Sequence, residues 1–362
     1  MKNTTLEVNT RKFIRNIEKI QAYVGNKTIM PIIKANAYGT YINKNLSILN
    51  HFQIVAVAEV SEAIEIRKTG YRKEIFVLNQ PSIEELKDIY NFNITIGLSE
   101  LDFLKKVDLP IKVHLEIETG MNRTGIKLED LKSFMEEIHQ NENITVEGIY
   151  THFSSADTDL EYTKKQFNTF EKAVEIAKEE FDLKYIHCSA SNGILNWKEE
   201  LSNTVRPGII MYGYEPFKGA KEKIPIEPIT VLKTKITYLK EINPGESISY
   251  NRRYTTEKPM KIATIPIGYA DGLRRELTGV GEVIVKGEKR RILGSICMDS
   301  CMIDVTGLDV KVGDPVTIWD NELITLEEIA SKCNTIHYEI MSTISERVER
   351  VFLDDNQKII SI

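Results

Sequence analysis

A lysine at the end of an apolar run is the first candidate for chemistry in this sequence. Lys34 closes the segment PIIK, where burial would disfavour the charged form of its amine. An amine whose pKa is lowered in this way can form a Schiff base with a carbonyl compound. A lysine whose amine reaches solvent at the rim of the fold explains this position equally well. Tyr38 follows four residues later, where its hydroxyl could bind a ligand.

Two arginines and a group of small polar side chains could bind an anion. Arg123 stands in the glycine-flanked segment ETGMNRTG, and Arg206 precedes a Pro–Gly pair in VRPGIIMYG. A single arginine is usually a structural ion-pair partner, but two that face one site favour an anionic ligand. The segment HCSASNGIL offers Ser189, Ser191 and Asn192 just before a helical pattern. Helix amides bind phosphate in such a place, although an ordinary helix cap explains one of these residues equally well.

His152, in the segment YTHFSSAD, could be a base, a metal ligand or a buried structural histidine. The six histidines include no H-x-x-x-H pair and no cysteine at a regular offset, so the sequence predicts no metal site. The G-x-S-x-G turn of many hydrolases is missing, and TGVGEV lacks the glycine spacing of a dinucleotide-binding loop. Acyl-transfer and NAD chemistry are therefore not expected.

The segments that carry these residues repeat one pattern from residue 10 to about residue 210. Short β-branched runs alternate with amphipathic stretches, the clearest of which is a helical stripe at 160–181. Eight alternations favour a (β/α)8 barrel of TIM type over an open doubly wound sheet, which also fits. Chemistry in such a barrel lies just after the C-terminal strand ends, where the candidates named above fall. The expected strands are 28–34, 53–58, 74–79, 93–98, 111–117, 144–152, 184–189 and 203–206.

After Pro225 the pattern changes to strands and hairpins without long helices. This predicts two domains, an α/β barrel over 1–224 and a mostly-β domain over 225–362. The turn KGEK reads as a hairpin tip. The expected strands are 229–242, 259–270, 282–296, 301–305 and 315–320, with a short helix at 325–333.

Composition excludes several classes of partner. The chain has 362 residues, of which 42% are hydrophobic, and 47 Lys and Arg against 53 Asp and Glu give a net charge of −6. The chain has no excess of basic residues that would bind the phosphate backbone of nucleic acid. No apolar run reaches the ~18 residues of a membrane span, and no signal-peptide pattern opens the chain, so a soluble cytoplasmic protein is expected. The four cysteines are irregularly spaced and read as reduced thiols.

Together these residues form a recognisable pattern, because the sequence resembles the alanine racemase family of pyridoxal-phosphate enzymes over nearly its whole length. Eight motifs in the family order carry the resemblance, and their combination is highly specific. They are IIKANAYG (32–39), HLEIETGMNRTG (114–125), THFSSAD (151–157), RPGIIMYG (206–213), SISYNRRY (247–254), PIGYADG (266–272), GSICMDSCMIDVT (294–306) and HYEIMSTISERVERVF (337–352).

The resemblance implies a cofactor, two bases and a second copy of the chain. Lys34 would bind pyridoxal 5′-phosphate covalently, and Tyr250 would be the second catalytic base, reaching the site of the other subunit of a homodimer. Racemisation removes a proton from one face of the α-carbon and returns one to the other face. A lone base would tend to restore the original enantiomer.

The resemblance also implies roles for other candidates. Arg206 would hydrogen-bond the pyridine nitrogen and, with His152, supply the positive charge that helps a phenol act as a base. An arginine does not readily donate its proton, so the ring would stay largely unprotonated, which limits transamination. Arg123 would lie near the cofactor's phenolic oxygen and the substrate carboxylate, which the Met298 amide would also bind. The phosphate would lie among Tyr38, Ser191, Gly208, Ile209 and Tyr338.

The sequence departs from the family pattern at several positions. Many members have a carbamylated lysine where this chain has Glu116, and we expect Glu116 to pair directly with Arg123. Thr40–Tyr41 replaces a histidine–glycine pair, and the arginine common before the CMD cysteine is replaced around Ser295–Ile296. The channel to the site is expected to include Arg275, Tyr269 and Ile336.

The leading interpretation is an enzyme that interconverts L- and D-alanine and supplies D-alanine for cell-wall peptidoglycan. A serine or broad-specificity racemase would keep the same fold and differ in pocket size. A pyridoxal-phosphate decarboxylase would not need Tyr250 on the opposite face. A non-catalytic carrier of the cofactor would need only the barrel and its lysine, which leaves the additional β domain unexplained.

Overall fold

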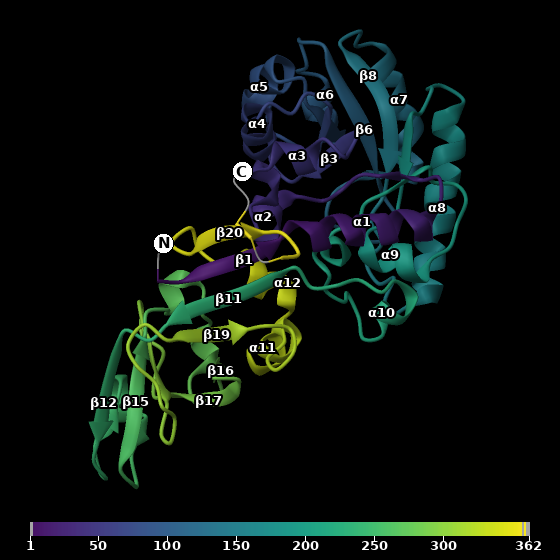
Figure 1. Ribbon diagram of the computed structural model, residues 1–362. Helices are drawn as coiled ribbons and strands as arrows, with labels where there is room; N and C mark the ends of the chain where they lie inside the picture. Colours follow the sequence, from purple (N-terminus) through teal and green to yellow (C-terminus); the bar gives the residue numbers. More distant parts are fainter. Residues whose placement is uncertain (1–2, 357, 360–362) are drawn as a thin grey trace. The chain divides into compact units, whose positions relative to one another are not determined.

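The computed structural model describes residues 3–356 and 358–359, which divide into two compact units (Figure 1). The barrel unit comprises Phe13–Ala37 and Ile42–Glu227. The β-rich unit comprises the N-terminal segment to Lys12, Tyr38–Tyr41 and the chain from Pro228 onward.

Eight parallel strands form the barrel unit, and they coincide with the eight expected runs. The strands from β3 to β9 pair side by side, and β10 pairs with β2. Bridges from Ala190 to Arg206 and from Ile32 to Ala56 join these two sheets, so the ring closes and the predicted barrel is confirmed. The strands are β2 (Thr28–Ile29), β3 (Ile54–Val57), β4 (Glu74–Val77), β5 (Thr95–Leu98), β6 (Ile111–Glu118), β8 (Ile144–Tyr150), β9 (Tyr185–His187) and β10 (Thr204–Val205), while β7 (Ile126–Lys127) pairs with β6.

Helices alternate with these strands because apolar residues recur on one face of each. The predicted stripe at 160–181 is helix α8 (Leu160–Lys178), which buries Phe170, Val174 and Ala177 and is capped by the Asp159 side chain. Strands β3 and β5 are buried at every residue, as parallel strands covered on both faces should be. The other helices are α1 (Thr10–Val24), α3 (Leu46–Leu49), α4 (Val60–Lys68), α5 (Leu86–Asn91), α6 (Leu101–Leu104), α7 (Leu131–His139), α9 (Ser191–Asn196) and α10 (Ala220–Lys223), whereas the segment α2 (Lys34–Tyr38) has left-handed backbone angles and is a turn.

The β-rich unit is built on one nine-stranded sheet, which is antiparallel except where β1 pairs with β20. Its order is β12 (Tyr238–Ile242), β15 (Met260–Ile265), β18 (Cys301–Asp304), β17 (Glu288–Leu293), β16 (Glu282–Val285), β19 (Pro315–Trp319), β11 (Thr230–Lys235), β1 (Thr5–Asn9) and β20 (Glu349–Leu353). A hairpin of β13 (Ser247–Ile248) and β14 (Tyr254–Thr255) and the helices α11 (Leu326–Lys332) and α12 (His337–Ser342) complete it.

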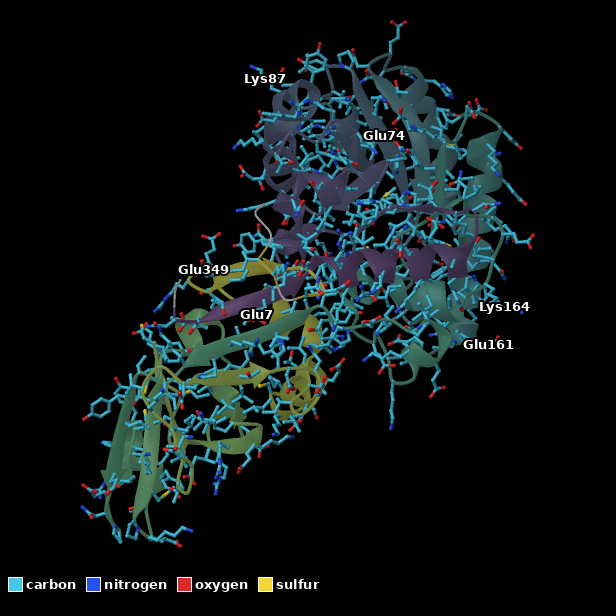
Figure 2. The ribbon with its side chains drawn as sticks, viewed as in Figure 1. Glu7, Glu74, Lys87, Glu161, Lys164 and Glu349 are labelled. Carbon is cyan, nitrogen blue, oxygen red and sulfur yellow. The ribbon has the colours of Figure 1, made fainter. Side chains whose placement is uncertain are left out.

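The N-terminal strand differs from expectation. β1 pairs with β11 and β20 and so belongs to the β-rich unit, a long-range pairing that no local pattern reveals. The ion pair of Glu7 with Lys233 at 2.7 Å joins β1 to β11, and Figure 2 labels Glu7. The boundary predicted between residues 224 and 225 stays a prediction. The expected hairpin tip is present, with Lys286 and Gly287 between β16 and β17.

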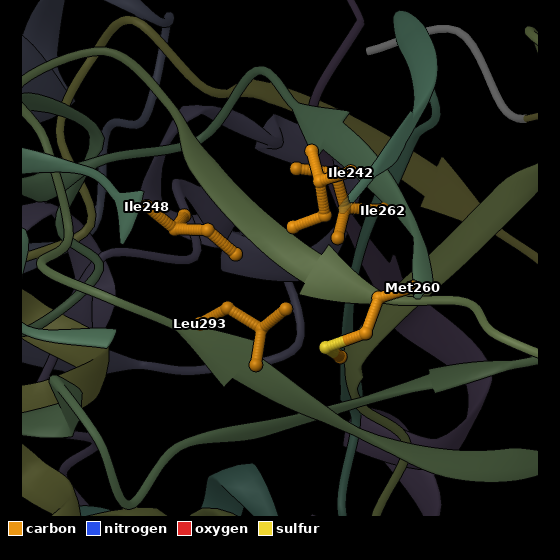
Figure 3. Close-up of a cluster of buried hydrophobic side chains, with 5 residues drawn as sticks. All are labelled: Ile242, Ile248, Met260, Ile262 and Leu293. Atoms are coloured by element: carbon orange, nitrogen blue, oxygen red, sulfur yellow. The ribbon is translucent and has the colours of Figure 1, made fainter. Parts of the chain in front are cut away.

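A small hydrophobic core supports the hairpin that carries Tyr250. Ile248 from β13 packs with apolar side chains of three neighbouring strands (Figure 3). Tyr254 and Met302 pack against this cluster. The cluster comprises Ile242, Ile248, Met260, Ile262 and Leu293.

Among the described residues, no helix is long and apolar enough to span a bilayer.

Candidate active site

Lys34 begins a turn of unusual handedness five residues after the first barrel strand, β2. The four residues that follow it, 35–38, all have φ between 52° and 55°, the left-handed region that costs a non-glycine residue roughly 1–2 kcal/mol. Lys34 itself is half-buried. Burial and the charge of Arg123 lower the pKa of its amine, and Glu62 opposes that shift. This environment favours a reactive amine over a lysine that merely reaches solvent.

Both terminal nitrogens of the Arg206 guanidinium donate hydrogen bonds within the barrel unit, and these bonds fix the side chain. It is only 1% exposed. Nη1 donates to the His187 carbonyl at 2.8 Å and lies 2.7 Å from His187 Nδ1, while Nη2 donates to the Thr151 carbonyl at 2.7 Å. A third carbonyl, that of Cys188, accepts from Nη2 at 3.2 Å. The cation therefore has one orientation and serves as a rigid donor and positive charge.

Two histidines for which the sequence predicted no role, His187 and His114, extend this network. Because arginine only donates, His187 Nδ1 must accept and its proton sits on Nε2. That nitrogen lies 2.9 Å from His114 Nδ1, which must also accept, so the His114 proton sits on Nε2. Among the described residues, this last nitrogen has no hydrogen-bond partner. Burial lowers the pKa of His187 well below its usual value and that of His114 to about 3.

His152 lies beside the arginine as a neutral imidazole. Its Nδ1 is 3.5 Å from Arg206 Nη2. Burial, followed by the charges of Arg206, Arg123 and Lys34, lowers its pKa to about 3. His152 is thus uncharged at neutral pH, so the positive charge expected from this pair comes from Arg206 alone.

The expected direct pairing of Glu116 with Arg123 is wrong. Glu116 is buried in β6, and its Oε1 accepts from the Thr124 hydroxyl at 2.9 Å, while Arg123 is exposed. No ion pair joins the two among the residues that the structure describes. Burial raises the pKa of Glu116, and Thr124 and then Arg123 oppose the rise. The loop side chain that contacts the Glu116 carboxylate is therefore the Thr124 hydroxyl and not the Arg123 guanidinium.

The loop of Arg123 is nevertheless held firmly at its base. The Glu118 carboxylate accepts from the backbone amides of Gly120 and Asn122. The Tyr162 hydroxyl donates to the Gly120 carbonyl at 3.0 Å. These contacts tie the loop to α8 and fix the point from which Arg123 projects.

Ser191 and Gly208 come together at the ends of two neighbouring strands. The Gly208 amide donates to Ser191 Oγ at 3.0 Å, so this serine does not cap α9. The cap position is held by Ala190, whose side chain makes no cap hydrogen bond. Ile209 begins the 3-10 turn Ile209–Tyr212 directly after Gly208. The geometry favours the ligand-binding interpretation of Ser191 over the helix-cap interpretation.

The remaining candidates lie in the β-rich unit. Tyr250 is 69% exposed and Met298 is 52% exposed, both far more than large apolar side chains usually are. The Tyr250 carbonyl accepts from Ser295 Oγ at 3.1 Å, which anchors the loop while leaving the phenol outside. Tyr338 stands on α12, and its ring centre is 6.1 Å from that of Tyr38.

Comparison with known proteins decides the family. The model of the alanine racemase N-terminal domain matches residues 8–216, and that of the C-terminal domain matches residues 229–352. The chain belongs to the alanine racemase family. An alanine racemase from Halothermothrix orenii is 38% identical over 353 residues, which cover 93% of each chain, and one from Methanococcus maripaludis is 37% identical over 96% of this chain and 98% of its own.

Solved alanine racemases share the fold. The enzyme from Clostridium difficile 630 superposes with a TM-score of 0.95 at 32% identity, covering 100% of this chain and 98% of its own. That from Bacillus anthracis, solved with bound L-Ala-P, gives 0.93 at 32% identity and covers 100% and 97%. These matches confirm the predicted resemblance, fold class and enzyme class, an amino-acid racemase.

Proposed function

We propose that this chain interconverts L- and D-alanine with pyridoxal 5′-phosphate as its cofactor and a homodimer as its functional unit. The observation that carries the proposal is the half-buried amine of Lys34, whose pKa is lowered, in the same unit as the fixed guanidinium of Arg206. Membership of the alanine racemase family supports the reaction and the substrate. Supply of D-alanine for cell-wall peptidoglycan is the role that follows.

The residues present fit this cofactor. An aldehyde needs an amine, a phosphate needs amide and hydroxyl donors, and a ring nitrogen needs a polar partner. Lys34 would supply the amine, Arg206 the partner, and the Ser191 hydroxyl, the Ile209 amide and Gly208 part of the phosphate contact, with the Gly208 amide orienting Ser191 through its hydrogen bond to Oγ. Next to Ser191, Asn192 Oδ1 is buried without a hydrogen-bond partner among the described residues, which leaves an acceptor for a donor group of a ligand and not for its phosphate oxygens. Tyr38 and Tyr338 would also contact the phosphate, and Arg123 would contact the cofactor near its phenolic oxygen.

When bound, the cofactor would withdraw electrons from the substrate α-carbon and so acidify its proton. The protein must then move that proton between two faces. Lys34 Nζ would take or return it on one face, and the Tyr250 hydroxyl of a second copy of the chain would do so on the other. The high exposure of Tyr250 supports a role toward another molecule, because a phenol used within its own chain is normally buried against it.

The other residues would orient the substrate and control charge. Arg206 is positively charged and cannot readily donate its proton, so it would hold the ring nitrogen without protonating it. His152, neutral at pH 7 because its pKa is about 3, would accept a hydrogen bond and leave the positive charge to Arg206. Arg123 and the Met298 amide would bind the substrate carboxylate.

A racemisation assay with one matched variant tests this proposal. We expect the wild type to form D-alanine from L-alanine, and to do so faster than it racemises L-serine. Tyr250→Phe should retain the cofactor's absorbance band yet lose racemisation by about a hundredfold or more, the usual effect of removing a general acid–base group. Tyr254→Phe, which changes a tyrosine of the same hairpin, should stay close to wild type. A wild type that binds cofactor but racemises neither amino acid would overturn the proposal.

A further inference from the structure

One acidic side chain outside all the predicted sites contacts the turn that follows Lys34. Glu62 lies in the first turn of α4, where the chain forms a capping box with Glu59. Its Oε2 accepts from the amides of Ala58 and Glu59 at 2.9 and 3.2 Å, as a capping residue does. Its Oε1 accepts from the Ala35 amide at 2.5 Å. A residue that only capped the helix would not need this second contact.

The Ala35 amide belongs to the peptide bond that directly follows Lys34. Ala35, Asn36 and Ala37 are held at φ 52–53°, and each left-handed non-glycine residue costs roughly 1–2 kcal/mol. Such a turn persists only where its surroundings hold it. Within the turn, the Ala37 amide donates to the Ile33 carbonyl at 3.0 Å, and the Ala35 amide is held by Glu62.

We propose that Glu62 is the positioning residue for Lys34, holding the left-handed turn through one carboxylate oxygen and placing a negative charge near the lysine amine. The inference rests on the proposed function only in taking Lys34 as the reactive amine. Because both oxygens accept from backbone N–H groups, a carboxylate is required: an amide in its place would turn its own NH2 toward one of these donors.

The charges around the amine come from three elements of the barrel unit. Arg123 in the loop after β6 and burial both lower the pKa of Lys34, and Glu62 on α4 raises it. His152, after β8, is near enough for Lys34 to lower its pKa, and it is neutral at pH 7. Glu62 is thus the acidic group that opposes burial and Arg123. Removing its charge should lower the pKa of the amine further.

Two measurements on the full-length chain, freed of cofactor, test the inference. The first is the pH dependence of labelling of Lys34 by an amine-reactive reagent, read by peptide mass spectrometry. In Glu62→Gln the midpoint should move to lower pH, raising labelling at pH 7 about threefold or more. The second is hydrogen exchange of the peptide that contains Ala35, which should be slow in the wild type and at least about tenfold faster in the variant.

Two control variants separate positioning from simple helix capping. Glu65→Gln changes an exposed glutamate of the same helix, paired with Lys68, and should leave both readouts unchanged. Glu59→Gln removes the other half of the capping box and should weaken α4 without moving the Lys34 midpoint. The inference would be overturned if the midpoint pH of Lys34 labelling stayed the same or rose in Glu62→Gln. It would also be overturned if that midpoint fell by the same amount in Glu59→Gln.

The wild-type measurement decides the matter if Glu62→Gln does not fold. An Ala35 amide that exchanges as fast as a free loop in the wild type would contradict the anchor directly. Neither readout involves racemisation. A chain that racemised nothing would therefore sink the proposed function while leaving the role of Glu62 open to these tests.

Discussion

Two buried histidines, His114 and His187, and the half-buried His152 make the stability of the protein depend on pH. His114 and His152 have pKa values of about 3, and that of His187 is also far below its usual value, mainly because of burial. An imidazole in the unfolded chain takes up its proton near pH 6.5. Between about pH 6.5 and 3 the unfolded state therefore binds up to three more protons than the folded state. We expect the free energy of unfolding to fall with pH by up to about 1.4 kcal/mol per unit for each group.

Urea unfolding between pH 7 and 5.5 checks this, because most carboxylates titrate below that range. His114→Asn should reduce the slope of the free energy of unfolding against pH by about a third, since one of three equal contributions is lost. The exposed His51 offers the matched control, and His51→Asn should leave the slope as it is. A slope that does not respond to His114→Asn would show that the buried imidazoles do not set the pH dependence.

Side chains at the strand ends could be found from the sequence, but their partners could not. Lys34 and Arg206 stand out because a charged residue closes an apolar run. His114 and His187 meet because β6 and β9 flank β8 in the barrel, and that proximity depends on strand order and register. Thr124, and not Arg123, contacts Glu116. This depends on which side chain of the loop points toward the strand, and the spacing of residues in the sequence does not determine that.

Elements were predictable where their hydrophobic period was regular. All eight barrel strands, the long helix α8 and the hairpin at Lys286 and Gly287 appear where expected. The left-handed turn after Lys34 was not expected, because Ala and Asn carry no signal for four successive residues of positive φ. Contacts from outside the turn, such as that of Glu62, hold it.

Gly39, the residue that follows that turn, offers a stability test with a close control. Gly39 and Gly25 have similar positive φ values of 77° and 67°. A Cβ on Gly39 would collide with the Met341 carbonyl of α12, whereas one on Gly25 would meet nothing within 4 Å. Gly25→Ala should cost about 1 kcal/mol from backbone strain alone. Gly39→Ala should cost at least about 1 kcal/mol more, because α12 must shift.

Urea unfolding of the two variants measures the difference. Arg350 Nε also donates to the Gly39 carbonyl at 2.9 Å, so a displaced turn would strain this contact as well. If the free energy of unfolding fell equally in the two variants, α12 would be able to shift without loss of stability. Tyr338, which α12 carries, would then not be held in place by this contact.

The whole molecule combines two units whose chain paths are interleaved. The N-terminal strand β1 lies in the β-rich sheet before the chain enters the barrel unit, and residues 38–41 return to the β-rich unit before the barrel continues. The turn that begins at Lys34 therefore ends in the other unit.

Co-expression of two inactive variants tests whether the site is shared between copies. If Tyr250 acts in the site of a second copy, a mixed dimer of Lys34→Ala and Tyr250→Phe has both defects in one site and neither in the other. Random pairing makes half of the dimers mixed, so about a quarter of wild-type activity should return. Each variant expressed alone should remain inactive. If Tyr250 acted within its own chain, every site would carry one defect, and co-expression would restore nothing.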